Sequence, residues 1–133
     1  MNSCYWLLNH TPTEQQRQEL LSVYNMEKIL FPPKEITSFW RDIPSLPFLP
    51  KDQMEMVFHW FDTMDKNDVA VVEGEMTATF SLVSFLWKRG VVVLSSVTER
   101  HARETRNGEK VVRSYVFQHI CFRAYQKFSL EEG

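Results

Sequence analysis

The stretch from Asp68 to Arg100 constrains the fold more than any other part of the chain. Residues 69–72 and 91–94 are short apolar runs without alternation, as in strands that are buried on both faces. Between them, Met76, Phe80, Val83 and Trp87 recur at helical spacing, and Lys88-Arg89-Gly90 is typical of a helix end. We therefore predict a strand–helix–strand unit.

Polar residues follow both strands of this unit. Strands joined by a single helix run parallel with a right-handed crossover, so Glu73–Glu75 and Ser95–Arg100 should lie at the same edge of the sheet. Gly74 permits a tight turn and close approach of a ligand. Open α/β sheets bind ligands at this edge, and a helix N-terminus binds anions. The alternative is that Glu73 and Glu75 only cap the helix.

The length of 133 residues predicts one domain, residues 1–133, with a single core. A hydrophobic content of 44% excludes a disordered chain. The first ten residues lack the basic segment of a secretory signal, and polar residues interrupt the best candidate for a membrane span, so we expect a soluble cytoplasmic protein. Cys4 and Cys121 lie in apolar strand-like segments and are expected to be buried free thiols.

Charge is distributed unevenly along the chain. Residues 1–75 contain 6 Lys+Arg and 12 Asp+Glu, whereas residues 76–130 contain 9 and 3. A protein of this kind can present a basic face while its net charge stays at -2. The basic face would suit a phosphate-bearing partner, although charge runs are also common on ordinary solvated surface.

The N-terminal part predicts a strand at residues 3–8 and then a helix. Thr11 is the expected N-cap, with Pro12 at the first helical position and Glu14 completing a capping box. The helix should run to about Val23, end at Asn25, and turn Leu20, Leu21 and Tyr24 inward. Asn9 and His10 then fall in a loop at the ligand-binding edge, where His10 could bind a ligand or hydrogen bond to the helix.

The middle of the chain supplies scaffold. We predict a strand at residues 28–31, a helix at 35–42, a proline-rich loop, and a helix that begins at Asp52. The second helix should bury a stripe of apolar residues on one face: Met54, Val57, Phe58, Phe61 and Met64. His59 and Trp60 beside this stripe are interpreted as packing residues.

The C-terminal part predicts a β-hairpin. Asn107-Gly108 is typical of a type I′ turn, and apolar and polar residues alternate from Lys110 to Arg123. The hairpin should join the sheet or project toward a partner subunit. His119 and Arg123 are four apart on a strand and are expected on the same side of it.

Several well-known sites are absent from the sequence, including a P-loop, GxGxxG, a nucleophile elbow and HExxH, and the four histidines are too scattered to indicate a metal. The expected edge of the sheet instead gathers hydroxyls, carboxylates, cations and imidazoles. Such a set suits a phosphorylated ligand and could support acid–base chemistry on it. Its members are Ser95, Ser96, Thr98, Glu73, Glu75, Glu99, Arg100, Arg123, His10, His101 and His119.

The chain resembles the small CRISPR-associated Csx proteins related to CARF domains. The resemblance rests on Asn9-His10 before a Thr- and Gln-containing helix start, on the Glu73–Glu75 turn, on Ser96–Arg100, and on the closing segment from His119 to Tyr125. It spans nearly the whole chain. This chain departs from the family in having Glu73 where members have Gln, and Val97-Thr98 where they have two threonines.

The resemblance implies a Rossmann-like, mostly parallel sheet flanked by helices, in a homodimer that binds cyclic oligoadenylate. Ring-nuclease members cleave that second messenger of type III CRISPR defence. Cleavage needs no metal or other cofactor if the ribose 2′-hydroxyl is held in line with the leaving 5′-oxygen. The alternatives are a binder that sequesters or senses the messenger without cutting it, and a protein-interaction module. Neither a membrane nor duplex nucleic acid is expected as a partner.

Within this hypothesis we assign Arg100 to the scissile phosphate, Thr98 and Ser96 to hydrogen bonds with phosphate or ribose, and Glu75 or His10 to proton transfer. Arg100 could instead be a surface cation that pairs with Glu99 or Glu104, and Thr98 could simply end a strand. The remaining expected ligand-binding residues are Asn9, Glu73, Gly74, Met76, Ser95, His119 and Arg123.

Overall fold

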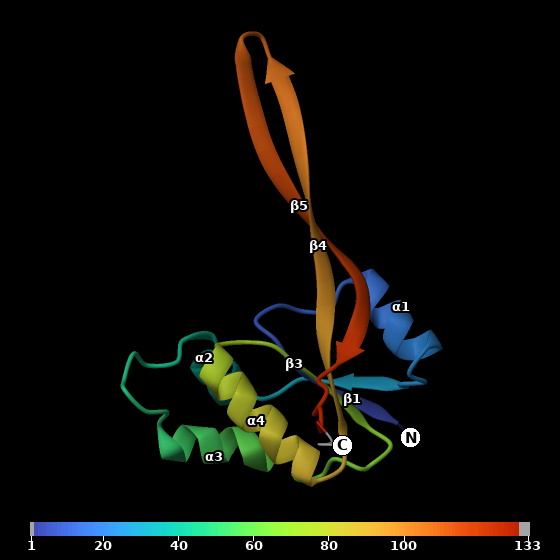
Figure 1. Cartoon of the computed structure of the whole chain (residues 1–133). Coiled ribbons are helices and arrows are strands. Elements are labelled where there is room, and N and C mark those ends of the chain that lie inside the picture. The colour runs from blue at the N-terminus through green and yellow to red at the C-terminus, as the bar shows by residue number, and fades with distance from the viewer. Residues whose placement is uncertain (1, 131–133) are drawn as a thin grey trace.

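The computed structural model of the chain describes residues 2–130, so the outermost ends of the predicted domain lie outside the described residues. As far as β4 the strands are separated by helices, with two helices between β2 and β3, and a long hairpin follows (Figure 1). In chain order the elements are β1 (Ser3–Leu7), α1 (Glu14–Ser22), β2 (Lys28–Leu30), α2 (Lys34–Arg41), α3 (Lys51–Trp60), β3 (Val69–Val72), α4 (Met76–Lys88), β4 (Val92–Asn107) and β5 (Lys110–Ala124).

One five-stranded sheet forms the centre of this mixed α/β fold, with the strand order β2-β1-β3-β4-β5. The first four strands are parallel and β5 is antiparallel to β4. All four residues of β3 are buried, and α4 joins β3 to the parallel strand β4. The predicted strand–helix–strand unit and the mostly parallel sheet are therefore confirmed.

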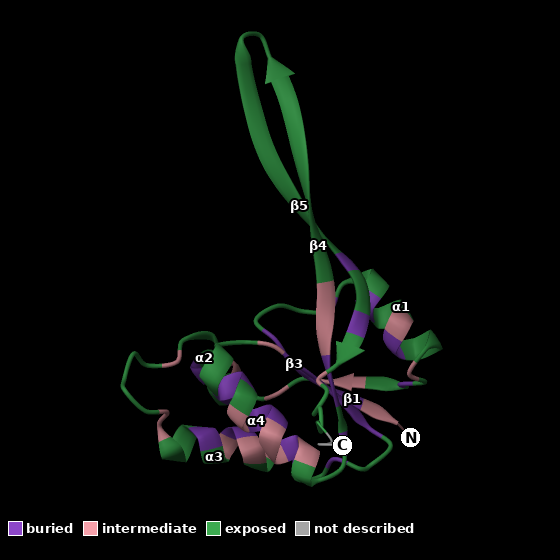
Figure 2. Cartoon of the chain, in the orientation of Figure 1, coloured by how far each residue is buried: buried purple, intermediate pink, exposed green. Residues whose placement is uncertain are grey.

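Helices cover both faces of the sheet. On one face, α1 contributes Leu20 to a cluster with Trp6, Val71 and Phe122. On the other face, α2, α3 and α4 pack over a larger cluster, and Figure 2 shows buried segments on all three helices facing the sheet. Within residues 2–130, no helix has the length and apolar character that crossing a membrane requires.

The apolar residues at helical spacing do not all lie on the buried face of α4. Ala78, Leu82 and Leu86 are fully buried, whereas Met76 is 80% exposed and Phe80 68% exposed. Of the four residues at that spacing, Val83 is buried and Trp87 partly buried. This helix is apolar on most of its circumference, so its sequence spacing does not decide which side meets the sheet.

The start of α1 also differs from the prediction. Thr13, not Thr11, is the N-cap: its hydroxyl accepts from the Gln16 amide, and the Gln16 side chain accepts from the Thr13 amide. The capping box thus lies two residues later than predicted, because Thr11–Glu14 and Thr13–Gln16 both have the required spacing. Leu21 is exposed, contrary to the prediction. The helix ends at Ser22 with Val23 as its C-cap, and Asn25, the predicted stop, follows with φ of 59°.

The hairpin is much longer than predicted. Strand β4 does not end near Leu94 but continues to Asn107, and β4 and β5 together project from the body as a two-stranded arm (Figures 1 and 2). Asn107 pairs with Lys110, so the central turn residues are Gly108 and Glu109. Only Gly108 of these has positive φ, at 68°, so the predicted type I′ turn at Asn107-Gly108 is wrong, and glycine at the first central position is typical of a type II′ turn.

A β-bulge separates the arm from the sheet. Val97 pairs with Cys121 but Thr98 pairs with His119, which leaves Ile120 as an extra residue on β5. The bulge reverses the alternation of β5. His119 and Arg123 therefore do not share a side as predicted; His119 is buried beside Phe122, and Arg123 is exposed.

Smaller corrections concern residues outside the sheet edge. Cys4 is buried as predicted, but Cys121 is exposed. His59 does not pack in the core; it is exposed and bonds to Asp62 at 2.8 Å. Trp60 does pack, with its ring 5.2 Å from that of Tyr5.

Candidate functional site

The carboxyl ends of three parallel strands meet at one edge of the sheet. Leu7 pairs with Val72, and Val71 pairs with Leu94, so the residues that follow β1 and β3 lie level with Ser95 and Ser96 of β4. The Glu73 amide continues this pairing by donating to the Leu7 carbonyl at 3.1 Å. The structure therefore places Glu73, Ser95 and Ser96 at a common edge, whereas Arg100 of the predicted second cluster lies farther along β4, on the arm.

Ser96 is the centre of a hydrogen-bonded group at this edge. Its Oγ lies 2.6 Å from Nδ1 of His119 and 3.1 Å from the Thr98 hydroxyl, and its amide donates to Oε2 of Glu73 at 3.4 Å. Gln16 of α1 reaches the same Oγ at 3.5 Å. Four of the residues expected from the sequence, Glu73, Ser96, Thr98 and His119, are thus brought together.

Glu19 completes this group, and sequence reasoning missed it. Its Oε1 lies 2.7 Å from Nε2 of His119, and its Oε2 accepts from the Phe122 amide at 2.8 Å. The His119 side chain is 4% exposed and that of Glu19 16% exposed. We name Glu19, His119 and Ser96 the Glu–His–Ser cluster. Nothing in the sequence of α1 marks Glu19, because its partner is 100 residues away.

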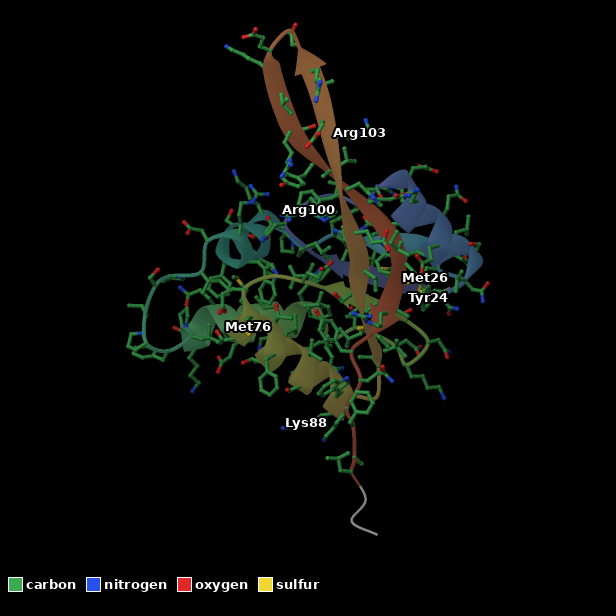
Figure 3. All side chains as sticks on the ribbon, turned by 45° about the horizontal axis from the view of Figure 1, so that its top comes forward. Tyr24, Met26, Met76, Lys88, Arg100 and Arg103 are labelled. Carbon is green, nitrogen blue, oxygen red and sulfur yellow. The ribbon has the colours of Figure 1, made fainter. Side chains whose placement is uncertain are left out.

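Arg100 lies on the same face of β4 as Ser96 and Thr98, because alternate residues of a strand point to one side. It is four residues beyond Ser96, or roughly 13 Å along the strand. Its guanidinium lies 4.3 Å from the centre of the Tyr115 ring. Figure 3 shows Arg100 and Arg103 on the arm, away from Met76 on α4.

The alternative reading of Arg100 as an ion-pair partner is not what the structure shows. Glu104 pairs with Arg113 at 2.9 Å, and Glu99 lies 3.4 Å from His101. Within residues 2–130, Arg100 forms neither of the expected pairs. Its charge is therefore available at the base of the arm.

Glu75 caps α4, as the alternative reading of the sequence had it. Its carboxylate accepts from the amides of Thr77 and Ala78 at 3.0 and 2.9 Å, and it also bonds to the Thr77 hydroxyl. These bonds, that to the Thr77 hydroxyl first, lower the pKa of Glu75. The expected anion site at this helix N-terminus is thus filled by the protein's own carboxylate, and Glu75 is not poised for proton transfer.

Gly74 and Met76, both expected to bind a ligand, line a cavity beside Glu73. The space that a side chain at Gly74 would need is occupied by the indole of Trp40. Met76 is 80% exposed, so most of its side chain is accessible to a ligand. Gly74 is therefore required for close packing of the protein itself.

Asn9 and His10 lie beyond the end of β1 and are exposed. Nδ1 of His10 is 2.8 Å from the Thr11 carbonyl, and the His10 carbonyl accepts from the Trp6 indole at 2.8 Å. No bond joins either of them to the Glu–His–Ser cluster among the hydrogen bonds of the described residues. The bonds of His10 stay within this loop and with Trp6 and do not reach α1, so they are not the helix contact considered for it.

Ser95 and Arg123 pair across β4 and β5 on the opposite face from Ser96. Near them, a cavity of about 380 Å³ opens beside Glu73. The Tyr125 hydroxyl at its wall donates to the Val72 carbonyl at 2.7 Å. Burial raises the pKa of Tyr125, with Glu73 adding to the shift against a hydrogen bond from Ser95. The carboxyl edge of the sheet therefore has two surfaces, one around Ser96 and one at this cavity, and Glu73 lies beside both.

Within the part of the chain that the structure describes, no three His, Cys, Asp or Glu side chains are placed to hold a metal ion. The side chains at the edge carry hydroxyls, carboxylates and an imidazole. Ser96 and Thr98 can donate to or accept from a ligand, and Arg100 can neutralise an anionic group.

Fold and site together define an α/β protein with a mostly parallel sheet, a projecting two-stranded arm, and a hydrogen-bonded Glu–His–Ser cluster at the carboxyl edge. The chain belongs to the Uncharacterized protein MJ1673 family, which it matches over residues 2–123. It is similar to the uncharacterized protein MJ1673 of Methanocaldococcus jannaschii, with 22% identity over 129 residues that cover 96% of this chain and 100% of the relative. No solved structure matches the chain.

Proposed function

We propose that this protein is a ring nuclease of type III CRISPR defence that binds cyclic oligoadenylate, with cyclic tetra-adenylate as the first candidate. In this proposal the sheet is a Rossmann-like fold related to CARF domains, the protein is a cytoplasmic homodimer, and it cleaves the ring without a metal. The observation that carries the proposal is the row of Ser96, Thr98 and Arg100 on one face of β4, with His119 bonded at its base.

The row matches the groups of an oligonucleotide. Arg100 would contact the scissile phosphate, and the hydroxyls of Thr98 and Ser96 would bond to phosphate or ribose. The Glu73 carboxylate accepts hydrogen bonds only, so it suits a ribose hydroxyl better than a phosphate. Such donors, when fixed in advance, stabilise the charge of the transition state by about 3 kcal/mol each.

The reaction would use the nucleophile that RNA itself carries. Attack of the ribose 2′-oxygen on the adjacent phosphorus forms a 2′,3′-cyclic phosphate and releases the 5′-oxygen. Holding these atoms in line can contribute ~7–11 kcal/mol in favourable cases. Strand β4 is paired with β3 only as far as Leu94, and beyond it Ser96 is held by its bonds to Glu73 and His119.

The exposed arm supports the homodimer. Isolated two-stranded ribbons are marginally stable in water, yet this arm exposes Val111, Tyr115 and Phe117 along the face that also carries Arg100. A second copy that covers this face would bury these residues and place two rows of Ser96–Thr98–Arg100 about a two-fold axis. A cyclic tetra-adenylate has matching even symmetry, so each subunit would hold one half of the ring.

Incubation of the protein with cyclic tetra-adenylate in EDTA, with resolution of the products, tests this proposal. Linear di-adenylate with a 2′,3′-cyclic phosphate is the expected product. An intact ring after many equivalents, together with a raised melting temperature, would instead indicate the non-catalytic binder. A ligand at 100-fold its Kd should stabilise the protein by about 2.7 kcal/mol. No stabilisation by any cyclic oligoadenylate would favour the protein-interaction module.

A further inference from the structure

The Glu–His–Ser cluster uses both nitrogens of a buried imidazole. Nε2 of His119 lies 2.7 Å from Glu19 Oε1, and Nδ1 lies 2.6 Å from Ser96 Oγ. A carboxylate can only accept, so Nε2 must carry the hydrogen toward Glu19. With a neutral ring, Nδ1 then has a free lone pair and accepts from the Ser96 hydroxyl.

Glu19 is itself held in one orientation. Its second oxygen accepts from the Phe122 amide at 2.8 Å, next to the bulge at Ile120. The Phe122 ring lies 4.6 Å from the imidazole and covers it. Carboxylate, ring and hydroxyl are thus fixed in a line, which is the arrangement by which many enzymes activate a hydroxyl.

We propose that Glu19, His119 and Ser96 form a proton relay in which Ser96 Oγ accepts the proton of the substrate's ribose 2′-hydroxyl. The proposal rests on the proposed function. Ser96 is the catalytic residue because it is partly exposed beside Thr98, whereas His119 is too buried to touch a substrate. His119 and Glu19 are positioning residues that act through Ser96.

The proposed step moves a proton and exchanges one phosphorus–oxygen bond for another. The 2′-hydroxyl proton moves to Ser96 Oγ while the Ser96 proton moves to Nδ1 of His119, and Glu19 stabilises the imidazolium that forms. The 2′-oxygen forms a bond to phosphorus, the bond between phosphorus and the 5′-oxygen breaks, and its electron pair goes to the 5′-oxygen. The 5′-oxygen leaves on the side of phosphorus opposite to Ser96 and takes a proton from solvent water, and the imidazolium returns to the neutral ring by releasing its proton through Ser96 to water.

The tautomer of His119 is the first test, and it needs no substrate. A long-range proton–nitrogen NMR spectrum of the ligand-free protein at mildly alkaline pH should show a neutral His119 ring with hydrogen on Nε2 and an accepting Nδ1. In Ser96→Ala, the Nδ1 resonance should move because its hydrogen bond is lost. A ring with hydrogen on Nδ1, or a doubly protonated ring, would overturn the relay.

Kinetics is the second test. Ser96→Ala and Glu19→Gln should lower kcat for cyclic tetra-adenylate by about 10²-fold or more, the range of general acid–base catalysis, with KM changed by less than about threefold. Glu19→Gln keeps an oxygen that accepts the hydrogen bond from the Phe122 amide, so this variant should still fold. Glu14→Gln is the matched control, since Glu14 lies on the same helix and is exposed.

The two proposals fail in different ways. If the wild-type protein leaves the ring intact, the protein is not a ring nuclease. The NMR spectrum still shows in that case whether His119 accepts the hydrogen bond from Ser96. If the wild-type protein cleaves the ring and Ser96→Ala retains kcat within about threefold, the proton relay is wrong but the nuclease function stands.

Discussion

The backbone of Gly74 lies directly against the indole of Trp40. A Cβ built on Gly74 would be 2.8 Å from Cε2 of that ring, and the indole nitrogen donates to the neighbouring Glu73 carbonyl at 2.9 Å. Trp40 is 2% exposed and packs in the larger core. The buried side chain of Trp40, from α2, therefore holds the turn that carries Glu73 in place.

Gly74→Ala should destabilise the protein, because the added methyl group would displace the indole of Trp40, which is buried in the core and bonded to the Glu73 carbonyl. Overpacking of this kind costs about 1–3 kcal/mol in the free energy of unfolding. Denaturant unfolding measures it. In a Trp40→Phe background the same substitution should cost less, and an equal cost in both backgrounds would mean that the indole is not the obstacle.

Glu75→Gln should lower thermal stability at neutral pH, because it removes the charged cap of α4. The pKa of Glu75 is lowered in the folded state, chiefly by its bond to the Thr77 hydroxyl. Its contribution is therefore present above the unfolded pKa and disappears as the pH falls through the lower folded pKa. The difference in Tm between the two proteins should shrink over this acidic range.

Thermal unfolding over a pH series provides the measurement. Glu109→Gln is a suitable control, since Glu109 is exposed at the turn of the arm. A Tm difference between wild type and Glu75→Gln that stays constant down to strongly acidic pH would contradict the capping role of the charge.

The sequence predicted the strand–helix–strand unit correctly because a strand buried on both faces must be apolar throughout, as Val69–Val72 is. It could not choose the buried face of α4. That helix carries apolar residues on most sides, and only packing against the sheet decides that Leu82 is buried and Phe80 exposed. The cap of α1 was ambiguous for a similar reason, since two overlapping segments satisfy the same spacing.

The candidate site was predictable in part. Ser96 and His119 each stood out as polar residues near a strand end, but their contact depends on the pairing of β4 with β5. The bulge at Ile120 turns His119 toward α1, and a single extra residue of this kind leaves no periodic signal. Glu19 could not be found because long-range side-chain pairs are fixed by tertiary packing.

The two cysteines should differ sharply in reactivity. Burial, with a smaller contribution from the charge of Asp68, raises the pKa of Cys4 to about 12, whereas Cys121 is exposed. The thiolate is the reactive form, and at about pH 8 almost none of Cys4 is ionised. Iodoacetamide should therefore modify Cys121 alone in the native protein.

Peptide mass spectrometry after alkylation locates the modified residue. Cys4 should become reactive only when the protein is unfolded in denaturant. Alkylation of both residues at similar rates without denaturant would show that β1 is not buried as the structure has it.

Phe117→Asp should convert the proposed dimer into a monomer, because it places a charge in the centre of the apolar face of the arm. Phe117 is 69% exposed in the single chain, and Phe48, in the proline-rich loop, is 68% exposed. Phe48→Asp is therefore a matched control that should leave the dimer intact. Light scattering coupled to size exclusion gives the mass of each protein, and a dimeric Phe117→Asp would place the interface elsewhere.

Arg100→Ala should reduce turnover of cyclic tetra-adenylate far more than binding. The guanidinium is held over the Tyr115 ring on the face of Ser96 and Thr98, so it is fixed before the substrate arrives. Removal of one such donor lowers kcat by about 10²–10³-fold, while Kd should change by less than about tenfold. Single-turnover rates and thermal titration separate the two quantities.

Arg106→Ala is the control, because Arg106 lies on the same face but three alternate positions farther along the arm. Equal losses of binding and turnover in Arg100→Ala would mean that Arg100 only holds the ligand, and equal effects of both variants would mean that the arm contributes only its overall charge.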